Sequence, residues 1–127
     1  MPDGRDVLNV APEEYREDRP WGGFRRLVQN EPCTVKVLTV HPGHRLSLQS
    51  HEHRAELWTF LDPGGIAEVD GKELHLEPGE QVWIPVGARH RLASAADAPG
   101  PVRVLELGFG KFDEDDIVRY DDEYGRA

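Results

Sequence analysis

Between residues 24 and 109 the chain is divided into short apolar runs by turn signals. Runs such as Thr34–Val40 and Gln81–Ile84 are separated by residue pairs that favour tight turns, among them Asp70-Gly71 and Pro78-Gly79. Strands of about four to eight residues at this spacing are typical of antiparallel sandwiches and barrels. No segment between them has the length or periodicity of an ordinary helix. The sequence therefore predicts an all-β domain.

The two ends of the chain lack this pattern. Residues 1–18 are polar and acidic, which predicts an N-terminal arm, and residues 19–112 are then expected to form one barrel. Residues 113–127 begin with the acidic string DEDDIVRYDDEYGR, whose few apolar residues predict a tail that docks on the barrel. A chain of 127 residues has room for a single core of this kind.

The composition limits which binding partners and which cellular compartment we expect. The formal net charge of −9 argues against nucleic acid or an anionic membrane as partner. The single cysteine, Cys33, excludes an internal disulfide and fits a reducing compartment. The chain has no apolar run of about 18 residues, and its first residues lack the apolar centre of a signal peptide. We therefore expect a cytoplasmic protein.

Residues 42–58, PGHRLSLQSHEHRAELW, combine the residue types of a metal site. Gln49, His51 and His53 recur at spacing two, and Glu56 follows. In an extended strand alternate side chains point to the same face, so these side chains would look into one cavity. The same alternation predicts that Arg45 and Ser47 face that cavity. Nitrogen and oxygen donors of these types suit a divalent transition ion.

Two spaced motifs resemble those of the cupin family, and the match covers residues 43–94. The first motif consists of Gly43, Gln49, His51, Glu56 and Pro63. The second consists of Gly79, Pro85, Gly87, His90 and Ser94. Gln49, Pro63 and Ser94 depart from the histidine, glycine and asparagine of the family pattern. The resemblance implies a cupin double-stranded β-helix, which is a jelly-roll barrel.

The cupin spacing also implies which side chains hold the metal. Counted from Gly43, the ligands are Gln49, His51, Glu56 and His90, which leaves His53 beside the ion. The alternative set replaces Gln49 by His53. We expect a divalent ion, with Zn²⁺ as the first choice and Mn²⁺, Co²⁺, Ni²⁺ or Fe²⁺ as alternatives, because nitrogen and oxygen ligands do not separate these metals.

A closer resemblance extends over residues 19–126. The strings RPWG (19–22), PGHRLSLQSHEHRAELW (42–58), PVGARHRL (85–92) and EDDIVRYDDEYGR (114–126) are similar to the type II mannose-6-phosphate isomerase domain. In that family the domain usually follows a GDP-mannose pyrophosphorylase domain on the same chain. This chain shows no Gly-rich nucleotide loop, so we expect the isomerase domain standing alone.

This resemblance implies a mannose-6-phosphate isomerase, an aldose–ketose isomerase that forms fructose 6-phosphate through an enediol. The implied catalytic residues are His53, which would transfer the proton, and Arg54, which would stabilise the oxyanion. Arg45, as a clamp for the phosphate, and Ser47 would bind the substrate.

Two other functions are also compatible with the sequence. One is a non-catalytic cupin that binds a sugar or sugar phosphate, and the other is a different metal-cupin enzyme such as a dioxygenase, because one fold hosts many chemistries. The expected partners are a small sugar phosphate and a second copy of the chain. The homodimer would form through the exposed edge that RPWGGF (19–24) creates.

Overall fold

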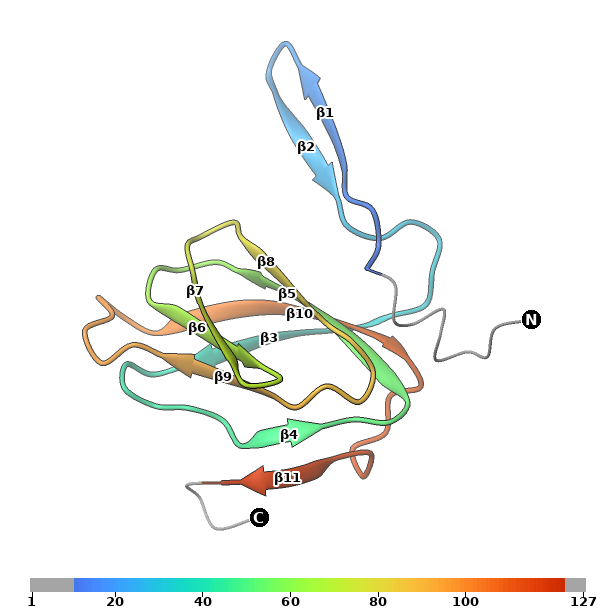
Figure 1. Cartoon of the computed structure of the whole chain (residues 1–127). Helices are drawn as coiled ribbons and strands as arrows, with labels where there is room; N and C mark the ends of the chain where they lie inside the picture. The colour runs from blue at the N-terminus through green and yellow to red at the C-terminus, as the bar shows by residue number, and fades with distance from the viewer. Residues whose placement is uncertain (1–10, 123–127) are drawn as a thin grey trace.

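The computed structural model describes residues 11–122, which form eleven strands in two larger sheets and one hairpin (Figure 1). All strand pairs are antiparallel, and the prediction of an all-β domain is confirmed. The first sheet has the order β3 (Thr34–Val40), β10 (Val102–Gly110), β5 (Arg54–Phe60), β8 (Gln81–Ile84). The second has the order β11 (Val118–Asp121), β4 (Leu48–Ser50), β9 (His90–Ser94), β6 (Gly65–Val69), β7 (Lys72–Leu76). Residues 11–122 contain no helix long and apolar enough to cross a membrane.

The turn signals in the sequence lie where the chain reverses. Asp70 and Gly71 connect β6 to β7 with φ angles of 47° and 82°. Both angles are positive, as a two-residue type I′ turn requires, and Asp-Gly is a preferred pair for that turn because glycine adopts positive φ without steric cost. Such short turns keep consecutive strands adjacent in the sheet.

The main hydrophobic core lies between the two sheets. Trp58 and Phe60 of β5 and Val104 of β10 are almost fully buried, and they face Leu92 of β9 and Ala67 of β6 from the other sheet. Burying a large apolar side chain contributes about 2 kcal/mol. This core occupies one part of the space between the sheets, and charged residues line another part.

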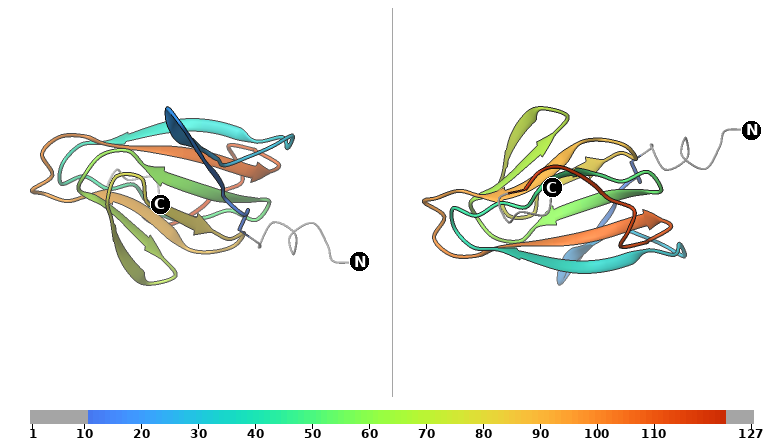
Figure 2. Two further views of the ribbon diagram at one scale, coloured as in Figure 1. Left: turned by 90° about the horizontal axis from the view of Figure 1, so that it is seen from above. Right: turned by 90° about the horizontal axis from the view of Figure 1, so that it is seen from below.

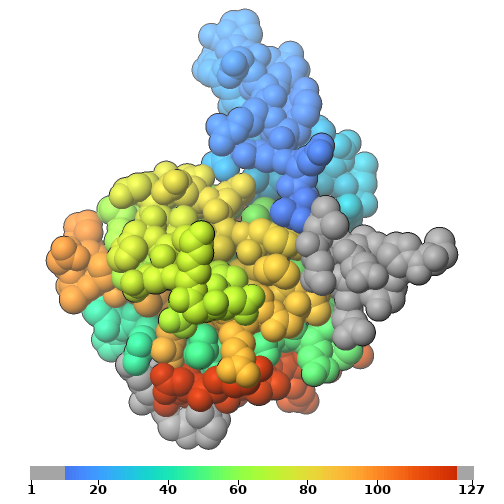
Figure 3. All heavy atoms as spheres, viewed as in Figure 1, coloured from blue at the N-terminus to red at the C-terminus, as the bar shows by residue number. Residues whose placement is uncertain are grey.

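The segment before the barrel forms a hairpin of β1 (Tyr15–Arg19) and β2 (Gly22–Arg26) that projects from the body of the molecule (Figures 1 and 3). The expected boundary between arm and barrel at residues 18 and 19 therefore falls inside a strand. At the base of the hairpin, Arg25 donates a hydrogen bond to the carbonyl of Gly79 at 3.2 Å. The first ten residues of the expected arm lie outside the described residues.

The expected tail carries strand β11, which adds to the second sheet by pairing with β4 (Figure 2, right). The hydroxyl groups of Ser50 and Tyr120 lie 2.8 Å apart, and Arg91 donates a hydrogen bond to the carbonyl of Asp121 at 3.1 Å. Residues 123–127 of the tail lie outside the described part of the chain. Its docked part closes one side of the barrel.

Candidate metal centre

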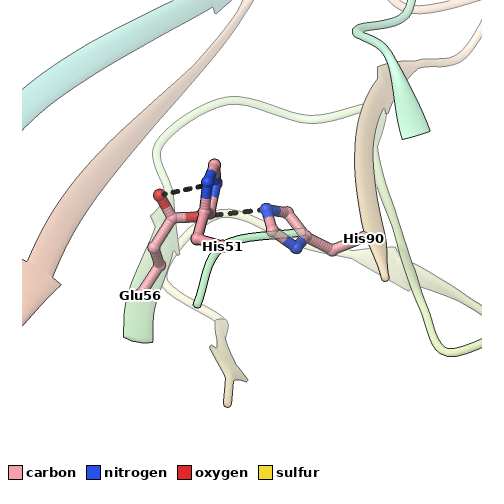
Figure 4. A group of neighbouring side chains, drawn as sticks. All are labelled: His51, Glu56 and His90. Carbon is pink, nitrogen blue, oxygen red and sulfur yellow. Dashed lines mark ion pairs between the residues drawn. The ribbon is translucent and has the colours of Figure 1, made fainter. Parts of the chain in front are cut away.

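Three buried side chains from three parts of the chain converge between the sheets (Figure 4). His51 follows β4, Glu56 lies on β5 and His90 begins β9. The Nε2 atom of His90 is 3.2 Å from Oε1 of Glu56, and Nε2 of His51 is 3.9 Å from Oε2 of the same carboxylate. One donor atom from each residue lies within 4.8 Å of the others, so this group can hold a metal ion.

A backbone hydrogen bond joins the two motifs at this point. The amide of Gly87, in the second motif, donates to the carbonyl of His51, in the first motif, at 2.8 Å. Gly87 has a φ of +83°, which an L-residue with a side chain rarely adopts. Glycine at this position therefore allows the turn before β9 to bring His90 next to His51.

The hydrogen bonds of the two imidazole rings leave their Nε2 atoms unprotonated. Nδ1 of His90 lies 2.9 Å from the carbonyl oxygen of Ala88, and Nδ1 of His51 lies 2.7 Å from that of Asp116. A carbonyl only accepts, so each Nδ1 carries the proton and each Nε2 keeps its lone pair. The lone pair of His90 faces Glu56, and that of His51 accepts a hydrogen bond from Nη2 of Arg54 at 3.2 Å. Hydrogen bonds from a ring nitrogen to a backbone carbonyl orient the histidine ligands of metal ions in other proteins.

The contact between His90 and Glu56 supports a metal between them. Nε2 of His90 and Oε1 of Glu56 are buried and find no hydrogen-bond partner among the described residues, although they lie 3.2 Å apart. In the tautomer that Ala88 imposes, the lone pairs of the two atoms face each other without a proton between them. A cation satisfies both atoms, and the residues present therefore fit a divalent ion.

The pKa shifts favour the unprotonated forms that metal ligands require. Burial acts to raise the pKa of Glu56, but His90 first, then a hydrogen bond from Glu106 and the charge of His51, lower it to about 2. Burial lowers the pKa of His51 and outweighs the opposing effect of the Glu56 charge. A carboxylate and a neutral imidazole bind a metal without first releasing a proton.

Gln49, the fourth predicted ligand, lies on the same side of the sheet as His90. The two residues are directly opposite each other on β4 and β9, and opposite residues of an antiparallel pair share a face. Gln49 lines a cavity together with Glu56, and its Oε1 accepts a hydrogen bond from the buried Ser47 hydroxyl at 3.0 Å. Whether Gln49 ligates the metal stays a prediction.

Every second side chain from Arg45 to His53 was expected to point into the cavity, but this holds only for the middle of the segment. Ser47 and His51 are buried, whereas Arg45 and His53 are exposed and belong neither to the metal group nor to the lining of the cavity. Strand β4 ends at Ser50, and the amide of His53 donates to the Asp116 carboxylate at 2.9 Å where the chain bends. The roles predicted for Arg45 and His53 thus receive no support from their positions.

Arg54 lies inside the site, as its predicted role requires. The residue is buried, Nη2 lies 3.2 Å from Nε2 of His51, and Nε lies 3.5 Å from Oε2 of Glu56. Its guanidinium also stacks on the ring of Phe112, with Cζ 4.5 Å from the centroid. Arg54 is therefore a fixed positive charge beside the metal group.

Sequence reasoning missed several residues of the cavity. Glu106 of β10 is buried beside Glu56 and accepts a hydrogen bond from the indole of Trp58 at 3.2 Å. Burial, followed by repulsion from the Glu56 charge, raises the pKa of Glu106 to about 8. Its position was detectable, because a lone glutamate in the apolar run VRVLELGFG (102–110) is a signal of a polar interior. The other missed lining residues are Lys36, Phe112, Glu114 and Arg119.

Comparison with known families gives one match that covers nearly the whole chain. The model of the family described as mannose-6-phosphate isomerase, C-terminal, matches residues 4–122. A mannose-1-phosphate guanylyltransferase of Klebsiella pneumoniae is 42% identical over 112 residues, which are 86% of this chain and 23% of that protein. The alginate biosynthesis protein AlgA of Pseudomonas aeruginosa is 40% identical over 127 residues, which are 98% of this chain and 25% of that protein. The chain thus spans about a quarter of the length of these curated relatives.

Solved structures identify the fold. The capsular polysaccharide assembling protein CapF of Staphylococcus aureus superposes with a TM-score of 0.64 at 17% identity, over 86% of this chain and 34% of that chain. A cupin 2 domain-containing protein of Halorhodospira halophila superposes with a TM-score of 0.57 at 21% identity, over 69% of this chain and 64% of that chain. At these identities the likeness concerns the fold alone, and the predicted cupin jelly roll is confirmed.

Proposed function

Because the chain belongs to the family of the mannose-6-phosphate isomerase C-terminal domain, we propose that it is a metal-dependent isomerase of mannose 6-phosphate and fructose 6-phosphate. The observation that carries the proposal is the convergence of His51, Glu56 and His90 beside a cavity between the sheets, with Nε2 of His90 and Oε1 of Glu56 left without a hydrogen-bond partner among the described residues. Family membership supplies the substrate class, and the convergent donors supply a reason for the cavity to do chemistry.

The reaction moves a proton between C1 and C2 of the open sugar and develops negative charge on the carbonyl oxygen. His51, Glu56 and His90 would hold a divalent ion, which as a Lewis acid would stabilise this charge. Zn²⁺ stays the first choice, and Gln49 stays the proposed fourth ligand. The buried position of all three side chains excludes water around the donors and strengthens every electrostatic interaction there.

Arg54 provides a second positive charge beside the site, in addition to the proposed metal ion. Its guanidinium lies within 3.5 Å of both His51 and Glu56, and Phe112 holds its plane. A fixed cation stabilises developing oxyanion charge without reorganisation during the reaction. We therefore retain Arg54 as the residue that stabilises the enediolate, and we do not assign the proton transfer to His53, whose side chain is exposed.

A coupled assay of fructose 6-phosphate formation from mannose 6-phosphate tests the proposal. The protein would be assayed without added metal and with Zn²⁺, Co²⁺ or Mn²⁺, and the His90→Ala variant would serve as the control that lacks a metal ligand. We expect turnover that depends on metal in the wild type and none in the variant. Bound metal without turnover under all these conditions would overturn the isomerase assignment.

One observation favours a second candidate, a non-catalytic domain that binds a sugar phosphate. The exposed His53 leaves the sequence-based proton-transfer residue outside the cavity. The names of the two relatives quoted above refer to guanylyltransferase activity or alginate biosynthesis, and each relative is about four times as long as this chain. Mannose 6-phosphate that binds stoichiometrically but is not converted would favour this candidate.

A further inference from the structure

Two half-buried cationic side chains line the cavity at a distance from the metal group. Lys36 lies on β3 and Arg119 lies on β11, so they come from different sheets. Each of these strands is at the edge of its sheet, because β3 pairs only with β10 and β11 pairs only with β4 among the described strands. The two cations therefore lie on edge strands, one in each sheet.

The register of the second sheet relates Arg119 to the metal group. Arg119 lies directly opposite Gln49, and Gln49 lies directly opposite His90. Residues in such a cross-strand row share one face of the sheet, so all three side chains point inward from neighbouring strands. Arg119 is thus two strands from the ligand His90, a separation of about 10 Å at the usual strand spacing.

A matching row crosses the first sheet. Lys36 lies opposite Glu106, and Glu106 lies opposite Trp58. The two rows face each other at their inner ends, where the ring centroids of Trp58 and His90 are 5.7 Å apart. Their outer ends, Lys36 and Arg119, both line this cavity.

Lys36 is held in place by an aromatic ring, and Arg119 has a donor that no described residue accepts. Nζ of Lys36 lies 4.2 Å from the centroid of Phe112, a contact that fixes the ammonium without accepting its protons. Nε of Arg119 is buried and has no hydrogen-bond partner among the described residues. A buried donor without an acceptor in the protein needs a partner from outside the chain, and a bound anion would supply one.

We infer that Lys36 and Arg119 bind the phosphate of a sugar phosphate whose carbonyl end lies at the metal group. A guanidinium and an ammonium on opposite walls match a phosphate dianion, and an open six-carbon chain can span the separation of about two strands. The identity of the sugar rests on the proposed function. The anion site itself rests on the cavity, and it replaces the clamp that the sequence placed at Arg45.

The cavity also holds three acidic side chains, and one of them, Glu106, lies opposite Lys36 and interacts with its charge. Glu56 belongs to the metal group, and Glu106 accepts the hydrogen bond of the Trp58 indole. Glu114, the third acidic residue of the lining, is exposed, so water screens its charge. Lys36 and Arg119 are the lining cations outside the metal group, since Arg54 is engaged with His51 and Glu56.

Inorganic phosphate is the direct probe, because its binding does not depend on turnover. Calorimetric titration of the metal-loaded protein would compare the wild type with Arg119→Gln, Lys36→Gln and Arg45→Gln. Arg103→Gln, an exposed arginine paired with Asp62, is the matched control. We expect a loss of at least about tenfold in phosphate affinity for the first two variants, because each removes a charge-assisted hydrogen bond. Arg45→Gln and Arg103→Gln should bind phosphate like the wild type.

Two further comparisons distinguish the loss of a phosphate ligand from a general effect of the substitutions on folding. Lys36→Gln tests the site from the first sheet, on a strand that does not pair with the docked tail strand β11. Arg119→Lys keeps a charge and should retain an intermediate affinity. Unchanged phosphate affinity in both Lys36→Gln and Arg119→Gln, or an equal loss in Arg45→Gln, would overturn the inference.

The outcomes also distinguish this inference from the proposed function. If the wild type binds phosphate in the expected pattern but converts no mannose 6-phosphate, the anion site stands and the isomerase assignment falls. If the wild type is active and both Lys36→Gln and Arg119→Gln keep their KM for mannose 6-phosphate, the assignment stands and the anion site falls.

Discussion

Nδ1 of His51 and the carbonyl oxygen of Asp116 lie 2.7 Å apart, although 65 positions separate them in the chain. The C-terminal tail thereby fixes the tautomer of a candidate metal ligand. The carboxylate of the same Asp116 accepts hydrogen bonds from the amides of Glu52 and His53, so the tail also holds the bend that follows the ligand.

Removing residues 113–127 should therefore weaken metal binding. Partners that orient a histidine ligand typically contribute about 10–100-fold to metal affinity, and we expect a loss in this range. Titration of Zn²⁺ against a competing chelator measures it. Removing only residues 123–127 leaves Asp116 and β11 in place and is the matched control; equal affinity of the two truncated forms would contradict the role of the tail.

Substitutions of the four predicted ligands should lower the metal affinity to different degrees. His90→Ala and Glu56→Gln each remove a donor of the buried group and should abolish stoichiometric metal binding. Gln49→Ala should lower the affinity less, because a carboxamide oxygen is a weaker donor than an imidazole nitrogen. Metal content after dialysis is the measurement. His53→Ala should retain its metal, and loss of the metal from this variant would restore the alternative ligand set.

The stability of the metal-free protein should fall as the pH rises from about 6.5 to about 8. Burial, followed by the Glu56 charge, raises the pKa of Glu106 to about 8, so the folded state keeps a proton that the unfolded chain releases near 4.5. The unfolded state then binds fewer protons, and stability decreases with pH by at most about 1.4 kcal/mol per unit. Below pH 6.5 the lowered pKa of His51 opposes this slope, because there the unfolded histidine binds the extra proton.

Urea denaturation of the metal-free protein across this range measures the slope. Glu56 does not contribute, since its pKa of about 2 leaves it ionised in both states throughout the range. Glu106→Gln removes the titrating group and should give a nearly flat profile. A wild-type profile as flat as that of the variant would show that Glu106 is already ionised at neutral pH.

Gly87→Ala should destabilise the protein and loosen the metal group. The positive φ of Gly87 costs an L-residue about 1 kcal/mol, although an added Cβ would have no heavy atom within 4 Å. An added Cβ at Gly100 would also meet open space, but Gly100 has no positive φ, so Gly100→Ala is the matched control. In chemical denaturation, the free energy of unfolding of Gly87→Ala should be about 1 kcal/mol lower than that of Gly100→Ala. Equal free energies would argue against a conformational requirement at Gly87.

The projecting hairpin is the expected contact of a homodimer. Trp21 at its tip is 74% exposed, and Tyr15 and Phe24 on its strands are also exposed. An apolar surface of this kind marks an interaction site more often than a free one. We expect Trp21→Ser to shift a dimer towards monomer in light-scattering measurements, whereas Leu61→Ser, on the barrel, should not. A monomeric wild type would remove the basis for this prediction.

The resemblance to two cupin motifs predicted which residues would meet, and the structure brings three of the four together. His51, Glu56 and His90 converge because two short motifs, each built around turns, determine where the chain reverses. Alternation along the strand failed at His53, because it holds only while the chain is extended and β4 ends at Ser50. The hydrogen bonds that bend the chain there come from Asp116, whose proximity no local pattern reveals.

The residues of the other sheet were missed for a different reason. Lys36 lies in the run TVKVLTV, where alternation places it on the same face as Leu38 and Val40 and therefore inside. That signal was present in the sequence, but the pairing of β3 with β10, which sets Lys36 beside Glu106, depends on contacts between residues far apart in the chain. Arg119 was missed because an acidic tail is ordinarily solvated.

The two ends of the cavity differ in how freely their walls can adjust. Glu56 and His90 lie on β5 and β9, each of which is paired on both sides, so a shift of either residue would break two ladders of hydrogen bonds. Lys36 and Arg119 lie on β3 and β11, each of which has one neighbour in the described sheets and can swing outward at lower cost. For the proposed sugar-phosphate substrate, selectivity should therefore be strict for the configuration near the carbonyl and tolerant towards the size of the anionic group at the other end.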